Sequence, residues 1–128
     1  MTIKEISEKT DVSADTLRYY ERIGLLPAVP RRPNGIREYD EFFIHWIAFI
    51  QDLKSLGMSL EAILDYIKLA KLGDISKEER KQIIMEVQNT LLDKIRILHT
   101  MVKKNNYHLE HYDDVLLPKT NELIYRFK

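Results

Sequence analysis

The chain has 128 residues, which is enough for one domain or for a small domain with an extension. Its 20 basic and 20 acidic residues balance, which excludes a uniformly basic nucleic-acid coat protein but not a local basic surface. Cysteine is absent, so disulfides, thiolate metal sites and thiol redox sensing are excluded. The first residues do not resemble a signal peptide, and no apolar run approaches the roughly 20 residues that span a bilayer, so we expect a soluble, cytoplasmic protein without membrane contact.

Two short helices joined by a tight turn are predicted at the start of the chain. The first is expected over residues 3–9 and breaks at Asp11-Val12. Ser13 is typical of an N-cap, and Asp15 places a carboxylate near the positive end of the helix that follows. This second helix is expected to stop at Gly24, because glycine suits a left-handed C-terminal cap.

Residues 27–39 differ from the helices around them. They contain three prolines and the dipeptide Asn34-Gly35. Asn-Gly is the strongest short hairpin signal, because both residues can adopt positive φ, and prolines suit edge strands better than helices. A small two-stranded hairpin is therefore predicted, with its tip near residues 32–35.

Two further helices are predicted between residues 40 and 72. Asp40 is expected to cap the first, which ends at Leu56-Gly57, and Ser59 is expected to cap the second. Their inward-facing residues recur at helical spacing. The turns of the first helix are marked by Phe43, Ile44, Ile47, Ile50, Leu53 and Lys54, and the inward residues of the second are Leu60, Ile63, Leu64 and Ile67.

A long helix is predicted from Ser76 to about Asn105. A break at Gly73-Asp74 precedes it, and Ser76 with Glu79 has the pattern of a capping box. Its apolar stripe averages the period of a straight helix and is narrow enough to suit one partner helix. The stripe consists of Ile84, Val87, Leu91, Ile95, Leu98 and Val102. The expected partner is the same helix of a second subunit, so we predict a homodimer; the alternative is packing against the N-terminal domain.

The last segment, residues 106–128, is a short tail that Pro118 is expected to divide. It is too short for an independent ligand-binding domain. Its apolar residues predict that the tail packs against another part of the protein instead of extending into solvent. They are Leu116, Leu117, Leu123, Ile124, Tyr125 and Phe127. The predicted organisation is an N-terminal domain over residues 1–72, a long helix over 73–105 that pairs with its copy, and a tail over 106–128.

The first 40 residues combine two helices with a basic hairpin, an arrangement that is typical of DNA binding. The second helix could enter the major groove while the first braces it. Ser13, Asp15 and Thr16 lie at its leading end, where base edges would be reached. Because helix-turn-helix spacing alone is a weak signal, an ordinary helical corner remains the alternative.

Five arginines between residues 18 and 37 stand against one acid, Glu21. Arg18 and Arg22 are four apart, so they share a helix face and could reach phosphates. The hairpin adds Arg31, Arg32 and Arg37, and the planar arginine fork suits phosphate and groove contacts. The alternatives are a solvated arginine loop and, for Tyr19-Tyr20, ordinary packing.

Three segments resemble signatures of the MerR family of regulators. Residues 13–26, SADTLRYYERIGLL, resemble the recognition-helix signature. Residues 34–39, NGIREY, resemble the first wing and the arginine-x-tyrosine that follows it. Residues 56–63, LGMSLEAI, resemble the second helical pair. The three segments lie in the family's order and spacing from Ile3 to about Leu72.

The resemblance implies a mainly α protein. Its parts are a winged helix-turn-helix DNA-binding domain over residues 1–72, a long dimerisation helix over 73–105 forming an antiparallel coiled coil, and a short C-terminal tail with a candidate effector region over 106–128. Residue by residue, the resemblance assigns phosphate or groove contacts to Arg18, Tyr19, Tyr20, Arg37 and Tyr39, and places Ser13, Asp15 and Thr16 near the bases.

The resemblance also implies a mechanism. Family members bind a near-palindromic operator inside a promoter whose spacer is too long. The signal-bound dimer bends and untwists this DNA, so the promoter elements realign for RNA polymerase. The protein would thus change the shape of the DNA rather than catalyse a reaction on a substrate.

The match weakens after about Leu72. Without cysteine, the sensing mechanisms of the mercury, copper, zinc and iron–sulfur branches cannot be carried over, and no cofactor is predicted. A large multidrug-binding domain is also missing, so the chain resembles the compact, short-tailed members. A small-molecule effector remains open and unidentified.

Other chemistry is less well supported. His108 and His111 could share a helix face and bind a metal, but a solvated polar segment is favoured and no metal site is predicted. We find no nucleophile–base motif and no phosphate-binding glycine loop, so an enzyme is not predicted. Two alternatives remain: a module that binds another protein, and a small-molecule binding protein. In the latter, a pocket would be lined by the dimerisation helix with Tyr107, Tyr112, Tyr125 and Phe127, although ordinary packing of these side chains is favoured.

Overall fold

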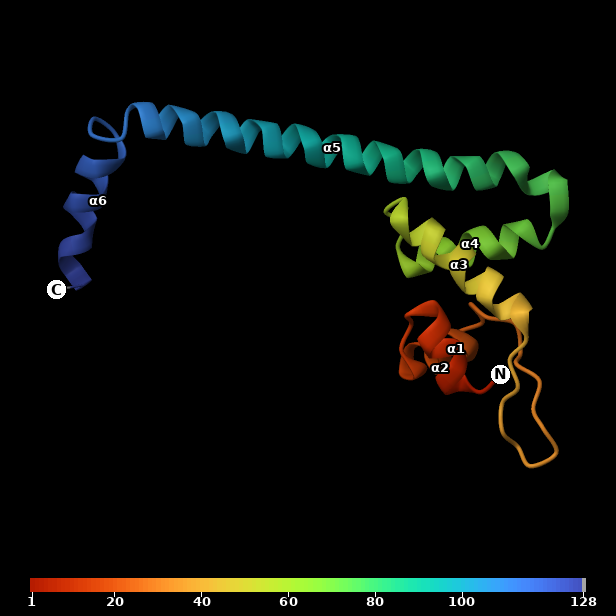
Figure 1. Cartoon of the computed structure of the whole chain (residues 1–128). Helices are drawn as coiled ribbons and strands as arrows, with labels where there is room; N and C mark the ends of the chain where they lie inside the picture. Colours follow the sequence, from red (N-terminus) through yellow and green to blue (C-terminus); the bar gives the residue numbers. More distant parts are fainter. Residues whose placement is uncertain (128) are drawn as a thin grey trace. The chain divides into compact units, whose positions relative to one another are not determined.

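The computed structural model describes residues 1–127, and the regular elements in this range are helices. In chain order they are α1 (Ile3–Thr10), α2 (Ala14–Arg22), α3 (Glu41–Ser55), α4 (Leu60–Ala70), the 3₁₀ helix η1 (Gly73–Ser76), α5 (Lys77–Glu110), α6 (Leu116–Ile124) and the 3₁₀ helix η2 (Tyr125–Phe127) (Figure 1). The predicted class is confirmed: the protein is mainly α, with a long helix after an N-terminal helix-turn-helix.

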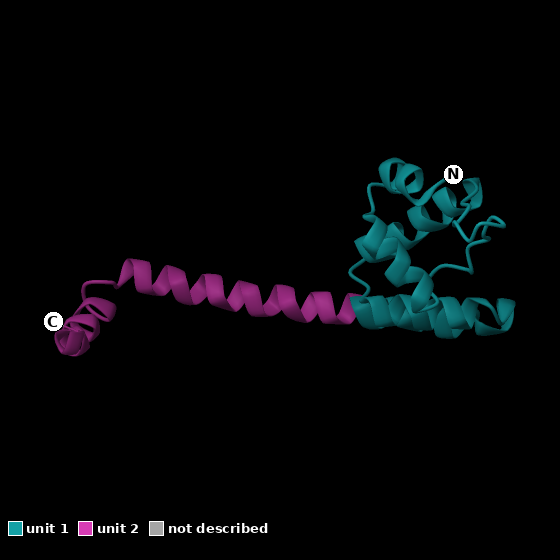
Figure 2. Ribbon diagram, turned by 90° about the horizontal axis from the view of Figure 1, so that it is seen from below, with its two compact units in different colours: residues 1–87 teal, residues 88–128 magenta. Residues whose placement is uncertain are grey.

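The chain forms two compact units, residues 1–87 and residues 88–128 (Figure 2). Unit 1 holds α1 to α4 and extends into α5, because Ile83 and Val87 pack against its core. The compact boundary therefore lies inside α5 rather than after residue 72. The predicted division into DNA-binding, dimerisation and tail segments is a functional one and stays a prediction.

The core of unit 1 combines the apolar faces of α1 to α4 with the segment that follows α2. Its most deeply buried side chains include Ile6, Leu17, Leu25, Ile50 and Ile63, each with no exposed surface. Burial of one such side chain contributes about 1.5–3 kcal/mol to folding. The inward faces predicted for α3 and α4 are confirmed, and this core fixes the orientation of α2.

The predicted helix caps are confirmed. The hydroxyl of Ser13 accepts a hydrogen bond of 3.1 Å from the backbone N–H of Thr16 at the start of α2. Asp40 and Ser59 cap α3 and α4 in the same way. Gly24 has a φ of 83° after α2, the left-handed conformation expected of a C-terminal cap.

The predicted capping box at the start of the long helix is wrong. Ser76 ends η1, and its hydroxyl is within hydrogen-bonding distance of the carbonyls of Leu69 and Gly73. Arg80 donates to the same hydroxyl over 3.2 Å. The last carbonyls of a helix lack partners within the helix, so Ser76 serves the end of α4 instead of the start of α5. The long helix runs from Lys77 to Glu110, past its predicted end near Asn105.

Residues 27–39 form a loop, called the wing loop below, instead of the predicted two-stranded hairpin. Its two limbs pair through one antiparallel bridge between Arg31 and Arg37. The N–H of Arg32 also donates to the carbonyl of Ile36 over 2.8 Å. With three prolines in the segment, few N–H groups remain for a longer ladder, because proline has no N–H to donate.

The turn at the tip of the wing loop also differs from the prediction. Gly35 has a φ of 86°, but Asn34 is not among the positive-φ residues, so the prediction of positive φ at both is wrong. A hydrogen bond of 2.8 Å from the N–H of Gly35 to the carbonyl of Arg32 closes the turn. Pro33 explains the difference, because its fixed φ suits the second position of an ordinary turn, which a left-handed glycine then follows.

Unit 2 contains the remainder of α5, followed by α6 and η2. The predicted division at Pro118 is wrong, because Pro118 lies in the first turn of α6, where a missing N–H is tolerated. The apolar tail residues are exposed, from 36% at Leu117 to 85% at Phe127, so docking of the tail stays a prediction. None of the helices within residues 1–127 has the length and apolar character needed to span a membrane.

Candidate nucleic-acid interface

The start of α2 presents a polar edge to solvent. Ser13 and Asp15 are exposed and Thr16 is half-buried. The Ser13 hydroxyl also donates to Oγ1 of Thr16 over 2.8 Å, which orders the first turn. On the opposite side of the helix, Leu17 and Tyr20 are buried in the core. The residues predicted to approach bases therefore lie together on the free side of a fixed helix.

Three of the five predicted contact arginines are paired with carboxylates. Nη1 of Arg18 lies 2.9 Å from Asp15, Nη2 of Arg32 lies 2.6 Å from Glu38, and Nε of Arg37 lies 2.7 Å from Glu21. The sequence count of one opposing acid omitted two of these carboxylates, because Asp15 and Glu38 flank the counted segment. The paired arginines carry less free charge than the sequence indicated.

Arg22 and Arg31 have no carboxylate within 4.0 Å in the described part of the chain, and both are exposed. The guanidinium of Arg22 lies 5.3 Å from the ring centroid of Tyr19, a cation–π contact. Nη1 of Arg31 donates to the carbonyl of Gly35 over 2.8 Å. Because this acceptor is neutral, the hydrogen bond does not compensate the positive charge of Arg31. These two residues supply positive charge for an anionic partner.

The three tyrosines of the predicted contact set differ in burial. Tyr19 is 42% exposed, whereas Tyr20 and Tyr39 are 5% and 1% exposed. The hydroxyl of Tyr20 accepts a hydrogen bond of 3.0 Å from Nζ of Lys54. The buried hydroxyl of Tyr39 has no hydrogen-bond partner among the described residues. Only Tyr19 offers its ring to a partner molecule.

Charges from α2 and from the wing loop act on one region around Tyr39. Burial raises the pKa of the Tyr39 phenol, the positive charges of Arg37, Arg18 and Arg31 oppose this rise, and Glu21 adds to it. Charge effects of this kind require proximity. The hydrogen bond of 2.7 Å from Nε of Arg37 to Oε1 of Glu21 places the wing loop against α2.

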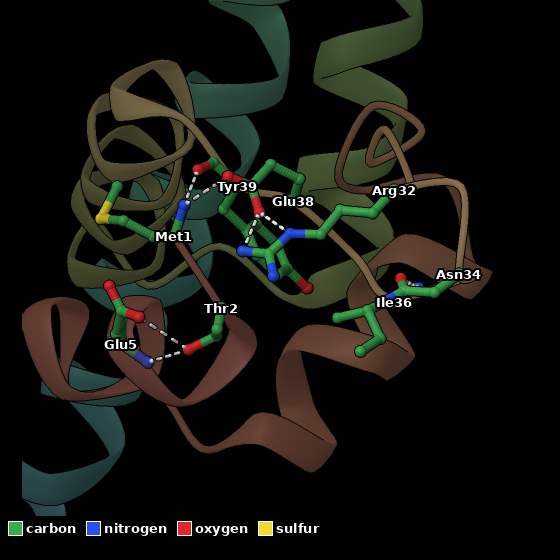
Figure 3. A network of polar contacts seen from close by, with 8 residues as sticks. All are labelled: Met1, Thr2, Glu5, Arg32, Asn34, Ile36, Glu38 and Tyr39. Carbon is green, nitrogen blue, oxygen red and sulfur yellow. Dashed lines mark hydrogen bonds and ion pairs between the residues drawn. The ribbon is translucent and has the colours of Figure 1, made fainter.

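The base and the tip of the wing loop are ordered by hydrogen bonds (Figure 3). The N–H of Tyr39 donates to the carbonyl of Met1 over 2.8 Å, and the amino group of Met1 donates back to the carbonyl of Tyr39. At the tip, the side chain of Asn34 accepts from the N–H of Ile36 over 3.1 Å. Figure 3 also shows the guanidinium of Arg32 against the carboxylate of Glu38.

Sequence reasoning gave no role to Glu38 or Lys54 and treated Glu21 only as an opposing charge. The Arg32–Glu38 pair had a usable signal, because residues on the two limbs of a predicted hairpin are cross-strand neighbours. The contacts of Glu21 and Lys54 had no such signal, because they join α2 to segments far along the chain.

The candidate metal site has no support in the structure. No group of three or more histidine, aspartate or glutamate side chains that could hold a metal ion lies within residues 1–127. The ring of Tyr107 packs against both histidines, with ring centroids 5.2 Å from His108 and 4.7 Å from His111.

A capped helix with a free polar edge, a bracing helix across a tight turn and an arginine-bearing loop define a winged helix-turn-helix domain of the kind found in regulatory proteins. Residues 1–69 match the sequence profile of the MerR HTH family regulatory proteins. The chain belongs to the MerR family, and the resemblance seen in its sequence is confirmed.

Curated relatives are transcriptional regulators. The HTH-type regulator AdhR of Bacillus subtilis is 42% identical over 93 residues, which are 73% of this chain and 66% of AdhR. YyaN of the same organism is 48% identical over 67 residues, or 52% of this chain and 49% of YyaN. A regulator of Haemophilus influenzae is 39% identical over 79 residues, or 62% and 58%. The chain thus spans from about half to just under two thirds of the length of these relatives.

Two solved structures of MerR family regulators resemble this chain in fold and sequence. One, from Listeria monocytogenes, is 36% identical with a TM-score of 0.65, covering 96% of this chain and 93% of the other. The second is HiNmlR, a family regulator lacking the sensor domain and solved bound to promoter DNA. It is 30% identical with a TM-score of 0.61, covering 93% and 90% of the two chains.

Proposed function

We propose that this protein is a homodimeric, sequence-specific transcription regulator that binds a near-palindromic operator in a promoter. The observation that carries the proposal is that α2, with its exposed polar start, and the arginine-bearing wing loop lie against each other through the contact of Glu21 with Arg37. Binding of promoter DNA by HiNmlR, a relative of similar fold, supports it. The MerR relatives are regulators, which agrees with a role that requires no catalysis.

In the proposed complex, α2 enters the major groove with Ser13, Asp15 and Thr16 nearest the bases. Phosphate contacts come from the exposed cationic side chains and Tyr19, and these fix the register of the protein on the duplex. The cationic set is Arg18, Arg22, Arg31 and Arg32, with Arg37 at its edge. Tyr20 and Tyr39 are buried, and the phenol oxygen of Tyr39 is buried as well, so neither ring is offered to DNA.

The proposed dimer forms through the apolar stripe of α5. In the single chain the stripe is exposed from Leu91 onward, with Leu91 41% and Ile95 62% accessible, whereas Ile84 and Val87 are half-buried. Exposed apolar stripes of this kind mark interaction surfaces. The stripe is nearly symmetric about Asp93, so it complements itself when two copies run antiparallel. The opposed pairs are then Ile84 with Val102, Val87 with Leu98, and Leu91 with Ile95.

A two-fold dimer presents two α2 helices at a fixed separation, which suits two half-sites related by inversion. Distortion of the DNA between the half-sites changes the relative orientation of promoter elements. We propose that an effector shifts this distortion and so controls access by RNA polymerase.

The proposal is tested by selecting genomic DNA fragments with the purified protein and titrating the selected fragments at several salt concentrations. We expect one inverted repeat within a promoter and a steep loss of affinity with salt, because each neutralised phosphate releases counterions. A double variant, Arg22→Gln with Arg31→Gln, is the control and should lose selection. Equal, weak binding to all fragments would contradict the promoter role and favour the protein-partner alternative.

A further inference from the structure

We propose that Glu21 is a positioning residue that holds the wing loop against α2, and that Arg37 acts mainly through this contact rather than as a free phosphate ligand. The inference deepens the proposed function, because it concerns how the two DNA-contacting elements are held together.

The carboxylate of Glu21 binds both limbs of the wing loop. Its Oε2 accepts a hydrogen bond of 2.9 Å from the backbone N–H of Val29, on the limb that leaves α2. Its Oε1 accepts a hydrogen bond of 2.7 Å from Nε of Arg37, on the returning limb. One side chain on α2 therefore fixes the loop at two points on opposite limbs.

This contact differs from the other ion pairs near the interface in its burial. The side chains of Glu21 and Arg37 are 18% and 25% exposed, whereas those of Asp15 and Arg18 are 96% and 47% exposed. Exposed pairs contribute little because water and salt screen them, whereas a sheltered, hydrogen-bonded pair keeps more of its strength. The Glu21–Arg37 pair is thus suited to hold geometry.

Glu21 lies on a helix that is anchored in the core of unit 1. Its neighbours on α2, Leu17 and Tyr20, are buried in the core, and Val29 at the other end of the contact is 5% exposed. The wing loop is therefore already held in place against α2 in the free protein, before DNA binds. A loop that is already ordered loses less conformational entropy on binding, which strengthens binding without a new contact.

Two explanations of the role of Glu21 predict opposite changes in DNA affinity when this side chain is replaced. If Glu21 acted only through its charge, its removal would favour binding, because an acid near DNA repels phosphates. If it positions the wing loop, its removal weakens binding although the net charge becomes more favourable. Glu21→Gln tests which change occurs, and Glu8→Gln is the matched control, because it removes an exposed acid on α1 that is not among the proposed DNA contacts.

The first measurement needs no DNA. The chain has no cysteine, so Ile36→Cys accepts a single nitroxide at the exposed tip of the wing loop. Electron paramagnetic resonance should show increased label mobility in Glu21→Gln and in Arg37→Lys, and no change in Glu8→Gln. Circular dichroism confirms that each variant is folded at the temperature used. Unchanged mobility in both Glu21→Gln and Arg37→Lys would overturn the proposal.

The second measurement titrates a promoter fragment recovered by the wild-type protein. Loss of a charged hydrogen bond predicts about tenfold weaker binding for Glu21→Gln, with an unchanged salt slope. Arg37→Lys should be equally weak, and the double variant no weaker than either single variant. Binding of Glu21→Gln as tight as that of the wild type would also overturn the proposal. If the wild type recovered no fragment, the regulator function would fail while the label experiment still tested the loop contact.

Discussion

The phenol oxygen of Tyr20 accepts a hydrogen bond of 3.0 Å from Nζ of Lys54, and the same ammonium lies 5.8 Å from the centre of the Tyr20 ring. This contact joins α2 to α3. The ring of Tyr20 is 5% exposed, so it belongs to the core of unit 1. A residue that the family resemblance assigns to DNA thus has a structural role in orienting α2.

Tyr20→Phe should leave the core packing intact and remove only the contact with Lys54. We expect a loss of about 1 kcal/mol in the free energy of unfolding, and a DNA affinity within about threefold of wild type. Urea denaturation and DNA titration measure the two quantities. A large loss of affinity at unchanged stability would show instead that the hydroxyl contacts DNA.

Arg18→Ala should weaken binding to all DNA sequences and lower the salt slope by about one, because one phosphate contact is lost. Arg18 is exposed and paired only with the exposed Asp15, so stability should change little. Lys81→Ala is the control, because Lys81 forms a comparable exposed pair with Glu78 on α5. If affinity and salt slope both stayed at wild-type values in Arg18→Ala, the assigned contact surface would be wrong.

Leu91→Asp should split the dimer, because it places a charge in the apolar stripe of α5. Asn89→Asp adds the same charge two residues earlier, on the far side of the helix from Leu91, and should remain dimeric. Light scattering distinguishes the two states by mass. Operator binding should disappear together with the dimer. A dimeric Leu91→Asp protein would place the interface elsewhere.

The stability contributed by Glu21 should depend on pH. Burial alone would raise the pKa of Glu21, but the hydrogen bonds from Val29 and Arg37 and the charges of Arg37 and Arg31 outweigh it and lower the pKa from its ordinary value of 4.5. Because the folded-state pKa is the lower one, the contribution is fully present above about pH 4.5 and is lost as the pH falls through the folded-state value.

Glu21→Gln lacks this contribution at every pH. The difference in unfolding free energy between wild type and variant should therefore be largest near neutral pH and shrink as the pH falls below about 4.5 and through the folded-state pKa. Urea denaturation across this pH range measures it. A difference that stayed constant into acid would mean that Glu21 stabilises the fold by packing and not by its charge.

Elements set by local interactions were predicted well from the sequence. The caps at Ser13, Asp40 and Ser59 depend on a side chain and a backbone N–H two or three residues away. The three family-like segments also identified the family correctly. Errors arose where two local signals competed, as when Pro33 set the turn that Asn34-Gly35 had indicated.

The candidate site was predicted less completely. The sequence located the arginines, but not which of them are free, because pairs such as Glu21 with Arg37 join residues 16 apart through the fold. It also assigned Tyr20 and Tyr39 to DNA by resemblance, although their burial depends on packing against distant segments.

By itself, then, the sequence determined the helices α1 to α5, the caps of α2, α3 and α4, the family and the apolar stripe of α5, because each depends on near neighbours or on a repeated pattern. The tertiary structure alone decided which tyrosine is exposed, which arginines keep their charge and how the wing loop is held to α2. These properties depend on burial and on contacts between segments far apart in the chain, which arise only when the core has assembled.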